Sequence, residues 1–376
     1  MKIFLFTLLL LGLTMVAQAQ TADYLFAYFT NNGEDGLHLM HSRDGLQWSA
    51  LNGGKSYLTP TVGSQKLMRD PCILQGPDGV FHMVWTTGWE GRDIGIAHSK
   101  DLINWSEQKA IPVMEHEPTV MNCWAPEIFY DAANKQYLIY WSTTIPGKFP
   151  ETAGSAGKGR NHRIYYVTTK DFVNYSKAAL FYDGGFNVID ATIVQDGKQF
   201  VMIVKDETEL PQAKKHLRIA TSNNAAGSYS KASDKFTMDW VEGATIIKIN
   251  GEWIVYYDMY RDHRYGAVKT RDWKMWETIT DKLDFPKGVR HGTVFAVSDA
   301  VMGRLRVSWR NALQQNADWY SSAEAMQMAD NVLLYQHDNG GWDKTLIWQC
   351  RLPPPNARKS SRKKMRPIRR LTTARL

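Results

Sequence analysis

Disulfide frameworks and zinc sites are excluded first, because the sequence has few cysteines. The chain of 376 residues contains three of them, Cys72, Cys123 and Cys350. A chain of this length builds a hydrophobic core without disulfides, and the spacing of the three thiols does not match a zinc site. A bridge between Cys72 and Cys123 stays open for an oxidising compartment, but the sequence favours two buried thiols.

Long apolar runs are also scarce. The one at residues 3–16 follows Lys2 and precedes a small-x-small cleavage site at residues 17–19. We interpret residues 1–19 as a signal peptide, which predicts an exported protein, periplasmic or extracellular. No later segment reaches the length that a membrane-spanning helix needs, so the sequence predicts no membrane span.

Acidic residues are missing from the end of the chain. Residues 344–376 hold 11 of the 45 Lys and Arg residues and none of the 38 Asp and Glu residues, which leaves residues 1–343 with a net charge of −4. The net charge of +7 for the whole chain therefore reflects this tail and not the body. Nothing else in the sequence points to nucleic acid, so we predict no nucleic-acid partner.

What the sequence has in abundance is a repeated motif. It consists of Ser or Thr, then any residue, then Asp, and an aromatic residue four positions later. Four good copies and one degenerate copy cover residues 42–48, 99–105, 169–175, 221–229 and 270–276. They start 57, 70, 52 and 49 residues apart, a length that fits four short strands with turns. Segments rich in Tyr, Trp, Val and Ile precede each copy and are typical of strands.

Five copies of such a unit predict an all-β fold, a five-bladed β-propeller over residues 20–312. The first copy contains only the strands that follow a hairpin. Its missing inner part lies near residues 291–309, with strand-like segments at 291–295 and 301–309. We therefore expect N- and C-terminal strands to share one blade and close the ring. An irregular β-sandwich is the alternative fold.

Three acidic residues head strand-like segments in different copies of the repeat: Asp70, Asp190 and Glu242. Each interrupts an apolar or aromatic stretch, where an acid would be buried unless it lined a cavity. Equivalent positions in a circular repeat face one axis, so we expect the three carboxylates to meet in one pocket. Clustering would push their pKa values apart, which suits one to accept a proton and another to donate one.

Around these acids the chain resembles glycoside hydrolase family 43, the five-bladed propeller enzymes that act on arabinosides and xylosides. The resemblance covers residues 24 to about 309 and consists of one short motif per blade. The motifs are Arg69-Asp70-Pro71, Trp124-Ala125-Pro126-Glu127, Ile189-Asp190, Glu242-Gly243 and His291-Gly292. Each motif alone is weak, whereas five of them in this order are specific.

The resemblance implies a role for each acid. Asp70 would be the general base, Glu242 the general acid, and Asp190 the residue that orients the acid and raises its pKa. Family 43 enzymes invert the anomeric centre, which requires the carboxyl groups of base and acid to lie roughly 6.5–9.5 Å apart, with room for a water molecule.

His291 has two open interpretations. The resemblance implies a histidine near the propeller axis, beside or ligating a hydrated calcium ion. The alternative is a polar side chain satisfied by neighbouring backbone. The sequence contains no acidic cluster of the calcium-loop type, so we expect no required cofactor, and any calcium ion at the axis would be structural or would tune a pKa.

Further side chains are candidates for binding the substrate. Trp89 and Trp124 are candidate stacking platforms for a sugar ring, with core packing as the alternative in a chain that has 14 Trp. The polar stretch 258–265 follows the hairpin after Glu242, and we expect Arg261 or Arg264 to reach the pocket from it. A solvated loop is the alternative for each arginine.

The character of the sequence changes beyond residue 312. The stretch 319–342 resembles the opening of a family 10 pectate lyase of the α/α type. An apolar stripe predicts a helix there: Met326, Ala329, Val332 and Leu333. We interpret residues 313–343 as a helical remnant of such a domain, without its catalytic residues, and residues 344–376 as a disordered basic tail. A frameshift near residue 344 and a genuine basic anchor are both open explanations of the tail.

Together these features predict an exo-acting, inverting glycoside hydrolase whose substrate is a plant cell-wall oligosaccharide or polysaccharide. An α-L-arabinofuranosidase is favoured, since the lyase-like remnant points to pectin side chains. A β-xylosidase or β-galactofuranosidase of the same fold stays open. So does a propeller that binds glycans without cleaving them, which would be favoured if any of the three acids faced away from the axis.

Overall fold

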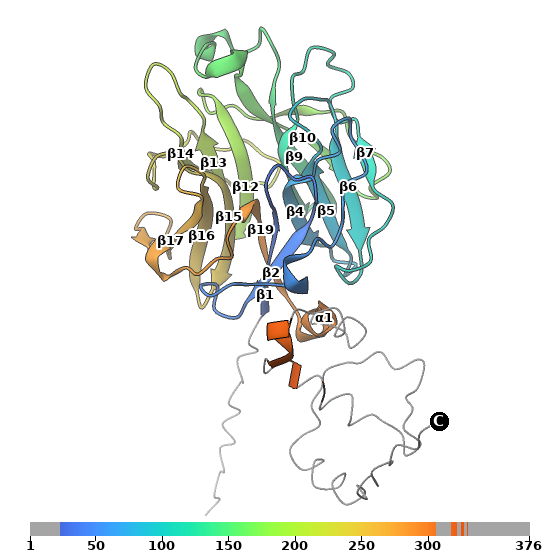
Figure 1. The fold of residues 1–376 in the computed structure, drawn as a ribbon. Helices are drawn as coiled ribbons and strands as arrows, with labels where there is room; N and C mark the ends of the chain where they lie inside the picture. Colours follow the sequence, from blue (N-terminus) through green and yellow to red (C-terminus); the bar gives the residue numbers. More distant parts are fainter. Residues whose placement is uncertain (1–22, 306–316, 322–324, 327–328, 330–376) are drawn as a thin grey trace, which may run out of the picture.

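Five antiparallel sheets surround one axis in the computed structural model, which describes residues 23–305, 317–321, 325–326 and 329 (Figure 1). The innermost strands of the sheets contact one another in a closed cycle, β4 to β8, β12, β15, β19 and back to β4. A closed cycle of inner strands defines a propeller and rules out the β-sandwich. The predicted five-bladed propeller is therefore confirmed.

The blades are numbered from the one that carries Asp70, and their strands run outward from the axis. Blade one contains β4 (Arg69–Gln75), β5 (Phe81–Thr86), β6 (Ile94–Ser99) and β7 (Lys109–Ile111). Blade two contains β8 (Trp124–Asp131), β9 (Gln136–Thr144), β10 (His162–Thr169) and β11 (Ala179–Tyr182). Blade three contains β12 (Val188–Asp196), β13 (Gln199–Asp206) and β14 (His216–Ser222). Blade four contains β15 (Glu242–Ile249), β16 (Glu252–Met259), β17 (Arg264–Thr270) and β18 (Glu277–Thr278).

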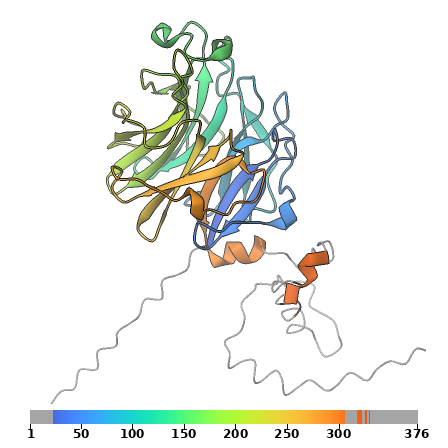
Figure 2. The ribbon, with the colours of Figure 1, turned by 60° about the vertical axis from the view of Figure 1, so that its left-hand side comes forward.

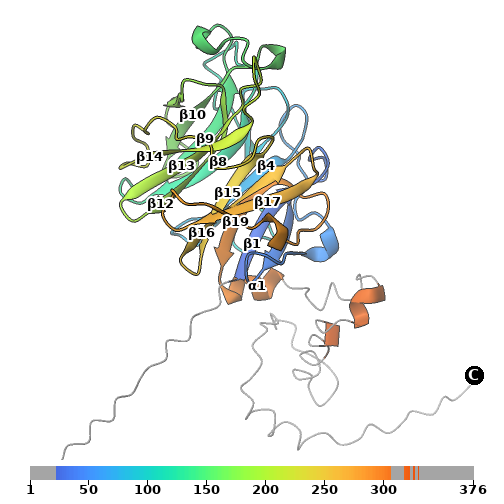
Figure 3. The ribbon, with the colours of Figure 1, turned by 90° about the vertical axis from the view of Figure 1, so that its left-hand side faces the viewer.

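Blade five joins the two ends of the described propeller, as the sequence predicts. It contains β19 (Arg290–Val297), β1 (Asp23–Phe29), β2 (His38–Ser42) and β3 (Ser49–Ala50). The C-terminal strand β19 is innermost and pairs antiparallel with the N-terminal strand β1, with Tyr24 opposite Ala296 (Figure 3). The ring is thus closed by backbone hydrogen bonds between segments from opposite ends of the sequence.

One part of the predicted blade five is wrong. Residues 301–305 belong to a helix, α1 (Asp299–Leu305), and not to a strand. Ser298 begins the helix, because its carbonyl oxygen accepts the backbone N–H of Val301 at 2.9 Å. The buried side chains of the helix then pack beneath blades five and one: Val301, Met302 and Leu305. This spacing matches a helical face, and residues 306–309 lie outside the described part.

The remaining short elements are 3₁₀ turns, four of them in connections between strands and the last one after α1. They are η1 (Asn52–Gly54), η2 (Pro150–Thr152), η3 (Gly157–Gly159), η4 (Thr280–Lys282) and η5 (Ala317–Ser321). Figure 2 shows α1 at one end of the propeller and the green turns η2 and η3 at the opposite end. The functional site described below lies at the end that carries η3.

The repeated sequence motif is a turn that ends the third strand of each blade. In the copy at residues 42–48, Asp44 Oδ1 accepts the backbone N–H groups of Leu46 and Gln47 at 2.8 and 2.9 Å. Asp101, Asp171 and Asp272 make the same pair of bonds. The turn is stabilised by its own side chains, which explains why it can be recognised in the sequence.

The hydrophobic core lies between neighbouring blades. It consists of five clusters of buried side chains, and each cluster joins two adjacent sheets. One cluster, for example, contains Trp85 of blade one and Leu25 of blade five. Cys72 and Cys123 are buried free thiols, which confirms the favoured interpretation of these cysteines.

The C-terminal predictions fall mostly outside the described residues. Of the expected helical remnant at residues 313–343, only a short 3₁₀ turn and scattered helical positions are described, and the tail from residue 344 is not. Among the residues that the structure places, there is no helix long and apolar enough to cross a membrane.

Candidate active site

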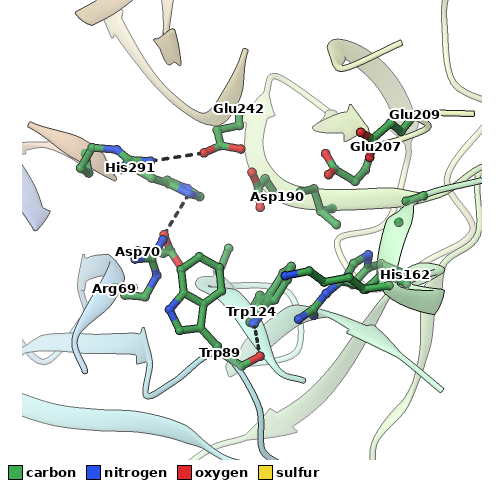
Figure 4. A pocket seen from close by; sticks show the side chains of 17 residues that line it. Arg69, Asp70, Trp89, Trp124, His162, Asp190, Glu207, Glu209, Glu242 and His291 are labelled. Atoms are coloured by element: carbon green, nitrogen blue, oxygen red, sulfur yellow. Dashed lines mark hydrogen bonds and ion pairs between the residues drawn. The ribbon is translucent and has the colours of Figure 1, made fainter. Parts of the chain in front are cut away.

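A cavity of about 480 Å³ opens at the axis, where the inner strands begin (Figure 4). All three predicted acids line it: Asp70, Asp190 and Glu242. His291 lines it as well, so the residues that the sequence predicts for the centre of the site do converge. A second wall comes from the segment 156–162 and from Glu207 and Glu209.

A β-bulge at the start of four inner strands aims these side chains. We call these segments the axial bulges: residues 69–72, 124–127, 189–192 and 242–245. The second residue of each bulge has a left-handed backbone, with φ of 51° at Asp70, 45° at Ala125, 52° at Asp190 and 61° at Gly243. Left-handed residues other than glycine are costly and gather at functional sites. Bulges redirect side chains next to such sites.

The bulges correct one expectation from the sequence. Asp70 and Asp190 are the second residues of their bulges, whereas Glu242 is the first residue of its own. The three acids are therefore not at equivalent positions. The second position in blade four is Gly243, where a Cβ atom would lie 2.5 Å from Cγ of His291. Glycine leaves room for the histidine, and the acid is presented from the preceding residue.

Asp70 is held as a carboxylate by two partners. Thr86 Oγ1 donates to its Oδ2 at 2.8 Å, and Nδ1 of His291 lies 3.3 Å from its Oδ1. Burial alone would raise the pKa of Asp70. The hydrogen bond and the charge of His291, with smaller effects of Arg69 and Thr86, instead lower this pKa to about 2. Asp70 is therefore ionised at neutral pH and able to accept a proton.

His291 carries the matching positive charge. Burial would lower its pKa, but the hydrogen bond to Asp70 and the nearby charges of Asp190, Asp70 and Glu242 raise it to about 9. The ring is therefore an imidazolium at neutral pH. Its partner is a carboxylate, not the neighbouring backbone that one sequence interpretation expected.

The residues around His291 do not fit a calcium ion held by the protein. Calcium takes six to eight oxygen ligands. Within the described ranges, no group of three or more His, Cys, Asp or Glu residues is placed to hold a metal ion. Nδ1 of His291 is already engaged with Asp70, which leaves this residue one ring nitrogen for any other contact. We therefore derive no chemistry from a metal at this position.

Asp190 connects blade three to the strand that carries Glu242. Its Oδ2 accepts the backbone N–H of Gly243 at 3.1 Å, and its own N–H donates to Oγ of Ser142 at 3.0 Å. Burial raises the pKa of Asp190 to about 6, with the charge of His291 opposing this effect and that of Glu242 adding to it. The hydrogen bond to Gly243 fixes the backbone on which Glu242 sits.

Glu242 is the most accessible of the three acids. Its side chain is 24% exposed, against 11% for Asp70. Lys205 Nζ donates to Oε2 at 2.9 Å, and Nη2 of Arg290 lies 3.7 Å from Oε1. Lys205 is buried and also pairs with Glu207 at 2.7 Å. Buried charges persist only when they are paired in this way.

Lys205 and Arg290 are site residues that the sequence interpretation missed. Lys205 lies in the apolar strand β13, and a lysine inside such a run was a usable signal. Arg290 directly precedes His291, and its Nε donates to Asp258 Oδ2 at 2.9 Å. The corresponding residue next to Asp70 is Arg69, which also lines the cavity.

The expectation for Arg261 and Arg264 is not met. Neither belongs to the residues that line the cavity. The guanidinium of Arg261 lies 3.1 Å from the ring centroid of Trp240, which holds it against that indole. Arg264 begins β17 with an exposed side chain. Arg290, on the innermost strand of blade five, lines the cavity in their place.

Trp89 and Trp124 line the cavity and do not belong to the core clusters. Trp89 is 44% exposed, and the Arg69 guanidinium lies over its ring at 4.2 Å. The Arg160 guanidinium lies over the ring of Trp124 at 4.1 Å. A ring face of each tryptophan is thus already covered by an arginine, which leaves the edges and the remaining faces for a ligand.

A fourth carboxyl group lies beneath the three acids. Glu127 ends the bulge of blade two, is buried, and accepts a hydrogen bond from Thr192 Oγ1 at 3.0 Å. Burial raises the pKa of Glu127 to about 7, although the charge of His291 and hydrogen bonds from Thr192 and Cys72 lower it in part. The sequence interpretation named this residue only as part of a motif, because its burial depends on the ring.

Comparisons with known proteins show which domains this chain is similar to. A family model described as a probable glycosyl hydrolase domain, related to glycosyl hydrolase family 43, matches residues 19–302. An α-L-arabinofuranosidase of Bifidobacterium longum is 24% identical over 211 residues, which are 50% of this chain and 19% of that protein. The chain thus aligns with about a fifth of the length of this curated relative.

Solved structures with a similar fold include two enzymes from distant organisms. An α-L-arabinofuranosidase from Lactobacillus brevis is 18% identical, with a TM-score of 0.44, over 56% of this chain and 72% of that one. An exo-β-1,3-galactanase from Phanerochaete chrysosporium is 13% identical, with a TM-score of 0.44, over 60% and 52% of the two chains.

The His291–Asp70 pair predicts a pH dependence of stability. The pKa of His291 is about 9 in the folded chain and 6.5 for the free side chain. The contribution of His291 to the free energy of unfolding is therefore complete below pH 6.5 and is lost as the pH rises through 9. This free energy changes by at most about 3 kcal/mol over the window. Urea unfolding of His291→Gln should show less loss of stability over this window than the wild type. The exposed control His116→Gln should follow the wild type, and equal slopes for all three proteins would contradict the pairing.

Glu127 predicts a separate effect at lower pH. Its pKa is about 7 in the folded chain and 4.5 for the free side chain. The folded state therefore binds the proton more tightly, and stability falls as the pH rises from 4.5 to 7, by up to about 3 kcal/mol. Glu127→Gln keeps the shape without the charge and should flatten this part of the curve. An unchanged curve in the same urea experiment would show that Glu127 does not titrate there.

Proposed function

Because the chain belongs to the family-43-related glycosyl hydrolases, we propose that it is an exo-acting, inverting glycoside hydrolase that releases a terminal furanose, with α-L-arabinofuranose as the favoured sugar. The observation that carries this proposal is the convergence of Asp70, Asp190 and Glu242 on one cavity in three different electrostatic environments. No member of this trio faces away from the axis, which argues against a propeller that only binds glycans.

Asp70 is suited to act as the general base. It is ionised at neutral pH and lines the cavity. In the proposed reaction it takes a proton from a water molecule as the water oxygen bonds to the anomeric carbon. The bond between that carbon and the leaving oxygen breaks on the opposite face, which inverts the configuration. The spacing of roughly 6.5–9.5 Å between base and acid remains a prediction of this mechanism.

Glu242 is suited to donate the proton that the leaving oxygen needs. It is the most exposed of the three acids and faces the same cavity as Asp70. Asp190 holds the backbone beside it through the Gly243 hydrogen bond. Lys205 and Arg290 orient the carboxyl group from its two sides. Asp190 is thus a positioning residue that acts through Glu242.

The proposed sugar follows from the similarity to a known enzyme. The match to a curated α-L-arabinofuranosidase favours arabinofuranosides, and we propose plant cell-wall side chains as their source. Export is part of the same proposal, supported by the apolar run at residues 3–16 and the cleavage site that follows it. A panel of 4-nitrophenyl arabinofuranoside, xyloside and galactofuranoside separates the favoured sugar from the two alternatives.

Substitutions of the base and the acid should differ in their dependence on the leaving group. Asp70→Asn should lower kcat by about 10²–10⁴-fold on 4-nitrophenyl glycosides and disaccharides alike, because water activation is needed for both. Glu242→Gln should cost a similar factor on a disaccharide but much less on the nitrophenyl glycoside, since nitrophenolate leaves without a proton. Steady-state kinetics on both substrates check this.

The stereochemistry of the product provides an independent check. Proton NMR of the first sugar released should show the inverted anomer. A retained anomer, or a wild-type rate for Asp70→Asn, would refute the assignment of Asp70 as the base of an inverting enzyme. Lys274→Ala, on an exposed turn of blade four away from the cavity, is a matched control that should keep the wild-type rate.

A further inference from the structure

Three buried polar atoms of cavity-lining residues lack a hydrogen-bond partner in the described part of the chain, and one of them, Oε2 of Glu207, is ion-paired with Lys205. The other two are Nε2 of His162 and Nη1 of Arg160. Both residues line the cavity. Figure 4 places His162 on the side opposite Asp70 and His291, with Trp124 between. Buried polar atoms are nearly always paired, so two unpaired atoms on one wall need a hydrogen-bonding group from outside the chain, a water molecule or a ligand.

The hydrogen bonds around His162 define which ring nitrogen carries the proton. Nδ1 lies 3.1 Å from Oδ1 of Asn187, and the same oxygen accepts the backbone N–H of His162 at 2.8 Å. The amide group of Asn187 is oriented by its Nδ2, which donates to the carbonyl oxygen of Arg160 at 3.4 Å. An amide oxygen only accepts, so Nδ1 is protonated and Nε2 presents a lone pair.

Burial keeps this ring neutral. The side chain is 1% exposed, and burial lowers the pKa of His162 to about 4, against a smaller opposing effect of the Asn187 hydrogen bond. Nε2 is therefore an acceptor over the whole neutral range. Arg160, two residues earlier, offers N–H donors from a guanidinium that packs on Trp124. The wall thus contains one acceptor and one donor without a partner in the described part of the chain.

This pair selects for a hydroxyl group. A hydroxyl donates one hydrogen bond and accepts others, so it satisfies Nε2 and Nη1 together. A carboxylate or phosphate has no proton for Nε2 and would face its lone pair. The ligand of this wall is therefore a neutral, hydroxyl-bearing group, in agreement with a sugar.

The wall is also built before any ligand binds. Arg163, fully buried, anchors the segment that carries Arg160 through Nη2 to Thr152 Oγ1 at 2.8 Å and Nη1 to Asn161 Oδ1 at 3.1 Å. At the other end of the segment, Ser155 O accepts the backbone N–H of Glu209 at 2.7 Å. A segment fixed in this way loses little entropy when a ligand binds.

We propose that His162 and Arg160 bind a hydroxyl of the second sugar unit of the substrate, the unit that leaves. The terminal sugar must lie at Asp70 and Glu242, where its bond is cleaved. The wall that contains Arg160 and His162, on the other side of Trp124, then faces the next sugar unit of the substrate. This subsite rests on the proposed function, because it takes its orientation from the catalytic acids.

The test compares two substrates of the same sugar. The 4-nitrophenyl glycoside that the wild type cleaves best has no hydroxyl on its leaving group, whereas the disaccharide of that sugar has several. His162→Phe keeps the packing on Trp124 but removes the acceptor. The ratio of kcat/KM for the disaccharide to that for the nitrophenyl glycoside should fall by at least about tenfold, as expected when a buried polar contact to substrate is lost. His162→Gln restores an acceptor and should recover most of the ratio.

Arg160→Met provides a second variant if His162→Phe folds poorly. Its long apolar side chain can still cover Trp124, and the same fall in the ratio is expected. A ratio within threefold of the wild type for both variants overturns the proposal, since a structural role would slow both substrates alike.

Calorimetric measurement of disaccharide and monosaccharide binding separates this result from failure of the proposed function. If the wild type cleaves neither substrate, weaker disaccharide binding by His162→Phe still supports the subsite, and unchanged binding rejects it.

Discussion

The ion pair between His291 and Asp70 is the contact on which the rest of the site depends. It joins β19, the strand that closes the ring, to β4, the inner strand of blade one, at 3.3 Å. The same contact keeps Asp70 ionised and His291 protonated, because each charge favours the other in a buried setting. The contact that joins the closing strand β19 to blade one is therefore also the contact that keeps the proposed base ionised.

The charges around the axis form a balanced set, and this balance explains why the carboxyl groups differ. His291 neutralises Asp70, while Lys205 and Arg290 approach Glu242 from two sides. The carboxyl group of Asp190 accepts a hydrogen bond from the backbone N–H of Gly243, which carries no charge, and burial raises the pKa of Asp190. Buried charges without partners are expensive, so the cation beside Asp70 lowers its pKa whereas burial raises that of Asp190. The three carboxyl groups therefore differ in their surroundings because each lies on a different blade.

The sequence predicted the features that are local and missed those that depend on pairing across the ring. The repeated turn is stabilised by bonds within five residues, so its motif alone revealed five blades. The offset of Glu242 from Asp70 and Asp190 follows from the register of β15 against β16, which no local motif reports. Arg290 replaces Arg261 for the same kind of reason, since Trp240 on a neighbouring connection holds Arg261 aside. The helix at residues 299–305 has too few residues to show a period before its packing on blades five and one is known.

The architecture separates the reaction from the choice of substrate. The acids, with His291 and Arg290, stand at the beginnings of inner strands, where the axial bulges and the closed ring fix them. Arg160 lies at the end of the connection between β9 and β10, and His162 is the first residue of β10, next to the anchoring residue Arg163. Rigid strands give the carboxyl groups the accuracy that proton transfer requires. Connections tolerate changes in length and sequence, so a new leaving group can be accommodated on the wall that contains Arg160 and His162 while the spacing of base and acid stays fixed.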